Sequence, residues 1–517
     1  MELGPYRVGA GGKLSYNDGS WDEFANVLFV DNPVGTGYSY VNTDSYLHEL
    51  PEMADQFIVF LEKFFKIFPE YEHDDIYLAG ESYAGQHIPY IAQAILQHNN
   101  NTATAAEHKW NLKGLLIGNG WISPVEQYQA YAEFAFAEGL IQGGTPQADQ
   151  VDSAMNTCLA ELGKPGAADR ITTQVCEDVL TTILDVTKVD DMCYNMYDIR
   201  LRDTSPSCGM SWPPDLTNVT PYLRQEDVVK ALHVNEDKRT GWQECSGAVS
   251  ANFRAKKSVA SKKLLPQLLE SGLPILLFSG AKDFICNHIG TENLIANMEW
   301  SGGKGFETAP GVWAPKRKWD FEGEPAGIYQ EARNLTYVLF YNSSHMVPFD
   351  YPRRTRDMLD RFMGVDIASI GGKPVDSQID GEKSHPETSV GGHPNSTAAQ
   401  VESQDKLHKA ELQAYYRSGE AVLAVVVIAA VIIGYLFWRN KRSSRSPLHE
   451  HQLGLYAPVP NGKPRDVEAQ DFDENELQRL SKKHKNQQFT DQDTYALGTE
   501  SEEDDEDVSR GKHKGVT

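Results

Sequence analysis

Apolar and polar positions follow two different periods along the first 365 residues of the chain. Short apolar runs with the length and composition of strands lie at residues 26–30, 112–117, 275–278 and 335–340. Amphipathic stretches with a helical period lie between them, as at residues 52–68. Strands that alternate with helices predict an α/β fold with a mostly parallel central sheet.

A helix-favouring segment interrupts this alternation at about residues 122–232. It contains four of the six cysteines, which are Cys158, Cys176, Cys193 and Cys208. We interpret the segment as a helical cap that is inserted into a globular domain spanning residues 1–365.

The pattern changes twice after that domain. Residues 366–420 are rich in Gly, Ser, His and Pro without any period, which predicts a disordered stalk. Residues 421–438 (AVLAVVVIAAVIIGYLFW) form an uncharged apolar run of about the length that spans a bilayer. The alternative, a buried core helix, fits poorly because both flanks are polar. The polar, acidic residues 439–517 have too few apolar side chains to fold.

Basic residues set the orientation of the predicted transmembrane helix. They follow the apolar run directly, at Arg439, Lys441, Arg442 and Arg445. The positive-inside rule therefore places residues 439–517 in the cytoplasm and everything before residue 421 in the lumen or outside the cell. Five Asn-x-Ser/Thr glycosylation sequons agree with that side, at Asn100, Asn218, Asn334, Asn342 and Asn395.

Net charge and short motifs exclude several classes of function. The chain has 48 basic and 73 acidic residues and a formal net charge of -25, which disfavours nucleic acid as a partner. Residues 9–13 (GAGGK) lack the spacing of a phosphate-binding loop. The chain has no His-Glu-x-x-His motif and no paired Cys-x-x-Cys motif, so no metal and no cofactor are predicted.

The hexapeptide at residues 80–85 (GESYAG) follows an apolar run and precedes an amphipathic helix. A strand, a sharp turn with a serine and then a helix form the nucleophile elbow of α/β hydrolases. Small residues flank Ser82 because this strained turn leaves no room for bulk. Ser82 is thus the predicted nucleophile of a serine hydrolase.

Two later strand ends supply partners in the order Ser, Asp, His. Asp283 follows the run at 275–278, and His345 follows the run at 335–340. Catalytic groups gather at the carboxyl ends of parallel strands, so we predict Asp283 as the orienting acid and His345 as the general base. Asp320 and His288 are weaker candidates because neither follows a strand end.

Several segments at and around these residues resemble the serine carboxypeptidase family. They are residues 30–40 (VDNPVGTGYSY), 81–89 (ESYAGQHIP), 117–120 (IGNG), 283–287 (DFICN) and 345–348 (HMVP). The resemblance covers roughly the first 365 residues and implies an α/β-hydrolase fold with carboxypeptidase activity.

The resemblance implies roles for further residues. Glu81 matches a carboxyl group that binds the substrate's C-terminal carboxylate, and Glu2 matches its partner. Two facing carboxyls cannot both ionise, so one stays protonated, which predicts an acidic activity optimum. The Tyr83 N–H is the expected oxyanion donor. Cys286 and Met346 match positions that line the substrate side of the site, with core packing as the alternative.

One departure from the family pattern concerns the N-terminus. Family members carry an Asn-Gly-Gly-Pro-Gly-Cys-Ser-Ser loop upstream of the segment that matches residues 2–5, and this loop supplies a second oxyanion donor. Losing one such donor costs about 3 kcal/mol. The resemblance also leaves Cys245 without its usual partner and Cys286 as a free thiol, with the other four cysteines in two disulfides of open connectivity. We expect an incomplete N-terminus.

The anchored architecture is similar to that of family members in the fungal late Golgi that remove C-terminal Lys and Arg. These act on pheromone and toxin precursors and are linked to programmed cell death. The resemblance implies precursors with basic C-termini as partners and a type I protein of the trans-Golgi network. Residues 456–459 (YAPV) fit a Tyr-based signal for sorting adaptors. Two alternatives are an acyltransferase on the same fold and a non-catalytic membrane-anchored binding protein.

Overall fold

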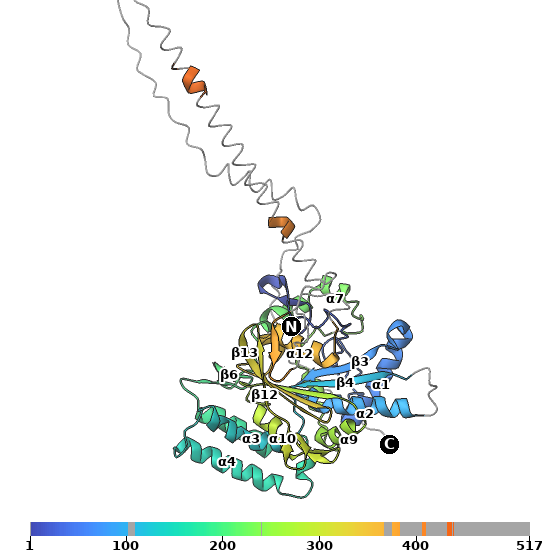
Figure 1. The fold of residues 1–517 in the computed structure, drawn as a ribbon, viewed down its shortest axis with the longest axis vertical. Coiled ribbons are helices and arrows are strands. Elements are labelled where there is room, and N and C mark those ends of the chain that lie inside the picture. The colour runs from blue at the N-terminus through green and yellow to red at the C-terminus, as the bar shows by residue number, and fades with distance from the viewer. Residues whose placement is uncertain are drawn as a thin grey trace, which may run out of the picture. The chain divides into compact units, whose positions relative to one another are not determined.

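A computed structural model describes residues 2–101, 109–238, 240–366, 375–382, 406–409, 432–436 and 438 (Figure 1). The chain divides into two compact units, Met1–Leu423 and Ala424–Thr517. The sheet and the labelled helices and strands described below all belong to the first unit.

A seven-stranded sheet organises the first unit, in the order β15-β12-β13-β14-β7-β4-β3. Four neighbouring strands run parallel: β3 (Asp75–Glu81), β4 (Asn111–Gly118), β7 (Ile275–Gly280) and β14 (Leu335–Phe340). The prediction of an α/β-hydrolase-like fold with parallel strands is therefore confirmed for this half of the sheet.

The other half of the sheet is antiparallel, which corrects the prediction of a mostly parallel sheet. Its strands are β13 (Glu324–Ala332), β12 (Arg317–Phe321) and β15 (Ser377–Ile379). Tight turns join β12 to β13 and β13 to β14, and Arg333 and Asn334 both have positive φ, of 49° and 68°. Two consecutive residues with positive φ are typical of hairpin turns, which can only join antiparallel strands.

Helices cover both faces of the sheet (Figure 1). On one face, Leu115 and Leu277 belong to the core that includes α1 (Leu50–Ile67) and α2 (Ala84–Asn100). On the other face, Leu116, Leu276 and Phe278 pack with residues of α12 (Pro352–Met363). Neighbouring strand residues alternate between the two cores, as side chains on a strand must.

Residues 26–30 do not form the strand that their composition predicts. β3 ends the sheet order, and in the described part of the chain no strand pairs with its outer side. Leu28 and Phe29 are 49% and 63% exposed. A strand gains its stability from cross-strand partners, so an apolar run without one stays irregular.

The strand β15 corrects the predicted stalk, since Ser377–Ile379 lie within residues 366–420. They pair with β12, and Ser377 and Ile379 are buried. The Ser377 hydroxyl donates to Asp357 Oδ2 (2.6 Å) and accepts from Trp319 Nε1 (2.9 Å). The folded unit thus continues beyond the predicted boundary at residue 365.

The predicted cap lies between β4 and β7 in the chain. It consists of α3 (Pro124–Ala137), α4 (Pro146–Leu162), α5 (Gln174–Val186), the hairpin β5 (Met192–Asn195) and β6 (Asp198–Thr204), α6 (Leu216–Leu223) and α7 (Glu226–Ala231). The disulfide Cys158–Cys176 joins α4 to α5, and Cys193–Cys208 closes the hairpin. Cys245 and Cys286 are free, as expected.

The remaining elements are short. They are β1 (Tyr6–Val8), β2 (Leu14–Tyr16), α8 (Gly247–Asn252), α9 (Leu265–Glu270), α10 (His288–Asn297), β8 (Glu299–Trp300), β9 (Gly303–Lys304), β10 (Glu307–Ala309), β11 (Val312–Trp313) and α11 (Val347–Asp350), with 3-10 turns at Ala10–Gly12, Pro69–Tyr71, Ala167–Asp169 and Ser261–Lys263.

Within the described residues, no helix is both long and apolar enough to cross a membrane. Of the predicted span at residues 421–438, only 432–436 and 438 are described, and they are helical. The tail at residues 439–517, with its sorting motif, and Asn395 lie outside the described residues.

Candidate active site

The turn between β3 and α2 is the nucleophile elbow that the sequence predicts. Ser82 has φ of 60°, a conformation that costs energy for any residue other than glycine. Its N–H donates to the Gly118 carbonyl (3.0 Å), and its carbonyl accepts from the Gly85 and Trp121 N–H groups (2.9 and 2.8 Å). A Cβ atom on Gly85 would lie 2.9 Å from the Trp121 nitrogen. The fold therefore forces this turn and excludes a side chain at residue 85.

Asp283 and His345 meet at the carboxyl ends of the adjacent strands β7 and β14. His345 Nδ1 lies 2.8 Å from Asp283 Oδ2, and the two side chains are 4% and 0% exposed. A buried carboxylate on Nδ1 fixes the ring and leaves Nε2 free to accept a proton. The structure thus brings together the acid and the base that the sequence predicts.

A third strand end contributes Asn119, which the sequence reasoning did not assign a role. Its Nδ2 donates to Asp283 Oδ2 (2.7 Å), and its Oδ1 accepts from the Gly280 N–H (3.2 Å). The Cys286 N–H donates to the other oxygen of Asp283 (3.3 Å). The available signal was the position of Asn119 directly after β4, the same placement that identified Asp283 and His345.

Cys286 lies beside both the predicted nucleophile and the Asp283–His345 pair. Its thiol hydrogen-bonds the Ser82 side chain, and burial together with the Asp283 charge raises the pKa of the thiol well above its ordinary value. A neutral thiol is a poor nucleophile, so Cys286 lines the site without competing with Ser82. In the described residues no hydrogen bond joins Ser82 to His345, as is common in free enzymes.

Asp283, Cys286 and His345 are also the one set of potential metal ligands found among the described residues. Their ligand atoms lie within 4.8 Å of one another. However, Asp283 Oδ2 already accepts hydrogen bonds from His345 and Asn119. These contacts account for the cluster without an ion.

Glu2 and Glu81 form the predicted carboxyl pair, and a hydrogen bond joins their side chains. Burial, then the charge of Glu2, raises the pKa of Glu81 well above its ordinary value. Burial also raises the pKa of Glu2, but its hydrogen bond with Glu81 and the Arg7 charge oppose this shift. The two carboxyl groups therefore share a proton. Glu81 Oε1 lies 3.8 Å from His345 Nε2, so the pair faces the reacting groups.

The structure also describes Tyr83, Met346 and four of the five sequons. Tyr83 immediately precedes α2, and its N–H has no backbone partner within the described chain. Met346 is half-buried beside His345. Among the sequons, Asn100, Asn334 and Asn342 are exposed and Asn218 is half-buried.

The fold and this arrangement of Ser82, Asp283 and His345 define an α/β hydrolase of the serine type. Residues 1–364 match the serine carboxypeptidase family. The chain belongs to this family, and it is therefore a serine-type carboxypeptidase, a hydrolase.

Individual relatives agree with this assignment. Pheromone-processing carboxypeptidase KEX1 of Coccidioides posadasii is 62% identical over 492 residues, which cover 93% of this chain and 76% of the relative. The protein of the same name from Phaeosphaeria nodorum is 57% identical over 543 residues, covering 99% of this chain and 84% of the relative. The crystal structure of Kex1(delta)p, a prohormone-processing carboxypeptidase from Saccharomyces cerevisiae, is similar with a TM-score of 0.66 and 38% identity, covering 70% of this chain and 79% of that one.

Proposed function

We propose that Ser82 attacks the carbonyl of the last peptide bond of the substrate. His345 accepts the Ser82 proton and returns it to the leaving amino acid, while Asp283 orients the ring. The Tyr83 N–H donates to the oxyanion. The observation that carries this proposal is the buried Asp283–His345 hydrogen bond of 2.8 Å beside the strained Ser82 turn.

The Glu2–Glu81 pair makes the enzyme specific for the C-terminal residue of its substrate. Protonated Glu81 donates a hydrogen bond to the substrate's terminal carboxylate, and Glu2 holds Glu81 in place. A fully ionised pair would repel that carboxylate. Cys286 and Met346 line the substrate side of the site, and their positions beside Asp283 and His345 support this role.

The substrates are peptide and protein precursors that end in Lys or Arg, including pheromone and toxin precursors, with a role in programmed cell death. Support comes from the names of the relatives, which process pheromones and a prohormone. The acidic chain, with its net charge of -25, also attracts basic peptides.

The enzyme works in the trans-Golgi network as a type I membrane protein. Residues 421–438 span the membrane, residues 439–517 are cytoplasmic, and Tyr456 begins a signal for sorting adaptors. The sequons at Asn100, Asn218, Asn334, Asn342 and Asn395 carry glycans on the luminal side. The apolar run and the basic residues after it support this topology.

Product analysis by mass spectrometry tests the proposal. Three peptides that differ only at the C-terminus, ending in Arg, in Leu or in an amidated Arg, are incubated with the full chain at acidic pH. We expect stepwise loss of the free Arg, slower loss of Leu and no loss of the amidated residue. Ser82→Ala abolishes trimming, whereas Ser271→Ala, at an exposed serine after α9, does not. Trimming that survives Ser82→Ala contradicts the mechanism, and equal rates for Arg and Leu contradict the specificity alone.

A further inference from the structure

The hairpin β5–β6 of the inserted segment contacts the loop that carries Asp283. The residues between its two strands are Met196 and Tyr197. The Met196 carbonyl accepts from the Phe284 and Ile285 N–H groups (3.1 and 3.0 Å). The Ile199 N–H donates to the Lys282 carbonyl (3.1 Å). The hairpin therefore binds this loop on both sides of Asp283.

The same hairpin contacts the loop that carries His345. The His345 N–H donates to the Tyr197 carbonyl (2.8 Å), and the Tyr197 ring lies 5.1 Å from the imidazole. Tyr197 also stacks on Trp212. One turn of two residues thus contacts His345 and the two residues that follow Asp283, although about 85 or more residues separate the turn from either loop along the chain.

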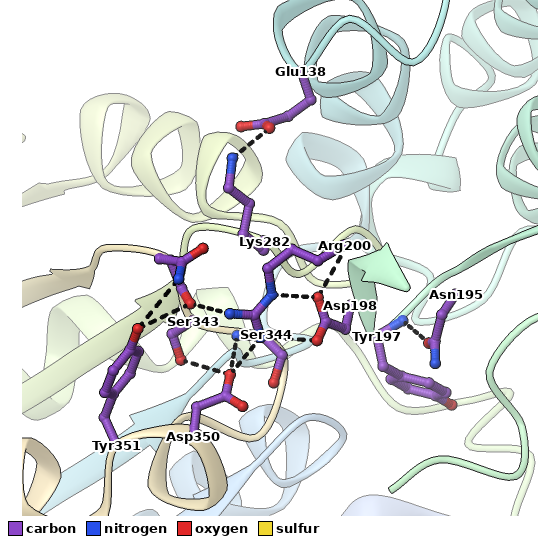
Figure 2. A network of polar contacts seen from close by, with 11 residues as sticks. Glu138, Asn195, Tyr197, Asp198, Arg200, Lys282, Ser343, Ser344, Asp350 and Tyr351 are labelled. Carbon is purple, nitrogen blue, oxygen red and sulfur yellow. Dashed lines mark hydrogen bonds and ion pairs between the residues drawn. The ribbon is translucent and has the colours of Figure 1, made fainter. Parts of the chain in front are cut away.

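Arg200, on β6, joins the hairpin to the His345 loop by hydrogen bonds (Figure 2). Its Nε and Nη2 bind the two oxygens of buried Asp198 (2.7 and 2.8 Å). Nη2 also contacts Asp350 Oδ2 (3.0 Å), and Nη1 donates to the Asn342 carbonyl. One guanidinium therefore holds the hairpin and both ends of the loop at once.

Asp350, which Arg200 binds, also binds the residue next to His345. Its Oδ2 accepts from the Ser344 N–H (2.6 Å). Charge-assisted bonds of this kind are short and directional, and a guanidinium offers them in a fixed plane. The side chains are partly exposed, 31% for Arg200 and 15% for Asp350.

We propose that hairpin β5–β6 is a positioning element for the Asp283–His345 pair, and that Arg200 is the positioning residue that holds the His345 loop against it. The inference rests on the proposed catalytic roles of Asp283 and His345. Arg200 touches neither the reacting atoms nor the Glu2–Glu81 pair, so its loss misplaces the base and leaves recognition of the substrate carboxylate intact.

The strand β6 offers a matched control in Arg202. Arg202 Nη1 donates to the Thr187 and Met192 carbonyls (3.0 and 3.1 Å), and its guanidinium covers the Tyr194 ring. All of these partners belong to the inserted segment. Arg202→Ala therefore removes the same charge from the same strand without touching either catalytic loop.

The test compares Arg200→Ala, Arg200→Lys and Arg202→Ala in the full chain. A displacement of about 1 Å at a catalytic group can cost about 100-fold in rate. We expect kcat to fall about 10- to 100-fold in both Arg200 variants, with KM and the Ki of free arginine within about threefold of wild type. Lys cannot bind Asp198 and Asp350 together, so Arg200→Lys carries the test if the Ala variant does not fold. Wild-type kcat in folded Arg200→Lys overturns the proposal, as does an equal loss in Arg202→Ala.

Labelling with an uncharged organophosphate separates this inference from the proposed function. The serine oxygen bonds to phosphorus, the leaving group departs as an anion and the base takes the proton, so the rate reports on His345 without any peptide. We expect the Arg200 variants to be labelled about 10- to 100-fold more slowly than wild type. Labelling of a wild type that trims no peptide would count against the proposed function, yet would still measure the effect of Arg200.

The two disulfides give an independent comparison. Cys193–Cys208 closes the hairpin and Cys158–Cys176 joins α4 to α5, with sequence separations of 15 and 18, so their removal changes the chain entropy by similar amounts. We expect Cys193→Ser with Cys208→Ser to slow labelling of the folded protein, and Cys158→Ser with Cys176→Ser to leave it unchanged. The reverse order of effects contradicts a positioning role for the hairpin.

Discussion

Asp283 accepts hydrogen bonds from two side chains through one oxygen, and each side chain follows a different strand. His345 Nδ1 and Asn119 Nδ2 lie 2.8 and 2.7 Å from Asp283 Oδ2. Asn119 thus fixes the carboxylate that we propose orients the base. Its φ of 42° also suits asparagine, which tolerates left-handed backbone better than most residues.

The substitution Asn119→Asp tests this role, since aspartate keeps the shape and the backbone preference but replaces a donor by an acceptor. A hydrogen bond to a charged group contributes about 1.5–3 kcal/mol, which corresponds to about 10- to 100-fold in rate. We expect kcat/KM to fall by that factor. Steady-state kinetics measures it, beside the control Asn156→Asp at an exposed residue of α4. A kcat/KM equal to wild type across the pH range would show that Asp283 needs no such support.

The carboxyl pair predicts a pH dependence with a defined sign. Burial and the Glu2 charge raise the pKa of Glu81, so Glu81 keeps its proton above the usual carboxyl range and loses it as the pH rises further. KM should therefore rise on the alkaline side. Glu81→Gln, which stays neutral and can still donate, should remove this rise. A wild-type profile of kcat/KM that is flat from pH 4 to 8 would contradict the assignment.

The raised pKa of Glu81 also makes the stability of the fold depend on pH. A carboxyl group whose pKa is raised in the folded state stabilises the fold most below its unfolded pKa of about 4.3. That contribution is lost as the pH rises through the folded pKa of Glu81.

At the residue scale, the sequence predicted Ser82, Asp283 and His345 because each follows an apolar run, a local signal. It did not reveal the role of Asn119, whose partners are 161 and 164 residues away. Nor could it reveal the hydrogen bond between His345 and Tyr197, which depends on how the inserted hairpin packs.

At the scale of the elements, β15 shows that a polar, Gly-rich stretch can still contain a strand. Ile379 is 5% exposed on β15 and pairs with Trp319. Arg361 binds the Ser377 carbonyl (3.0 Å) and Glu382 (2.6 Å), so α12 holds both ends of the strand. Composition alone predicted disorder here because the strand has only three residues and its stability comes from these distant partners.

The strand predicts a contrast between neighbouring substitutions. Ile379→Ala removes a buried side chain and should lower the free energy of unfolding by about 2–3 kcal/mol. Gln378→Ala, on the exposed face of the same strand, should change it by less than about 0.5 kcal/mol. Thermal and denaturant unfolding of both variants measures the difference. Equal stabilities would mean that β15 adds nothing to the folded unit.

The other elements were also predictable only where their signal is local in the sequence. The four parallel strands were predictable in outline because buried parallel strands are continuous apolar runs. The antiparallel half and the irregular residues 26–30 were not, since pairing partners decide both. The hairpin turns at Glu322–Gly323 and Arg333–Asn334 lack the common Asn-Gly signal.

At the scale of the whole molecule, the chain joins a folded enzyme to an apolar run and a polar tail. The proposed topology predicts that the full chain sediments with membranes, resists alkaline carbonate and dissolves in detergent. Deletion of residues 421–438 should release the enzyme, and deletion of residues 439–517 should not. Glycosidase treatment should increase electrophoretic mobility. Extraction of the full chain by carbonate would contradict the span.

The central claim is that Ser82 is the nucleophile and His345 its base. The most direct measurement is to locate, by peptide mass spectrometry, the adduct formed by an uncharged organophosphate on the full chain. We predict one adduct, on Ser82, that His345→Ala slows by at least about 100-fold. An active enzyme with its adduct on another residue, or an unchanged rate in His345→Ala, would contradict the account.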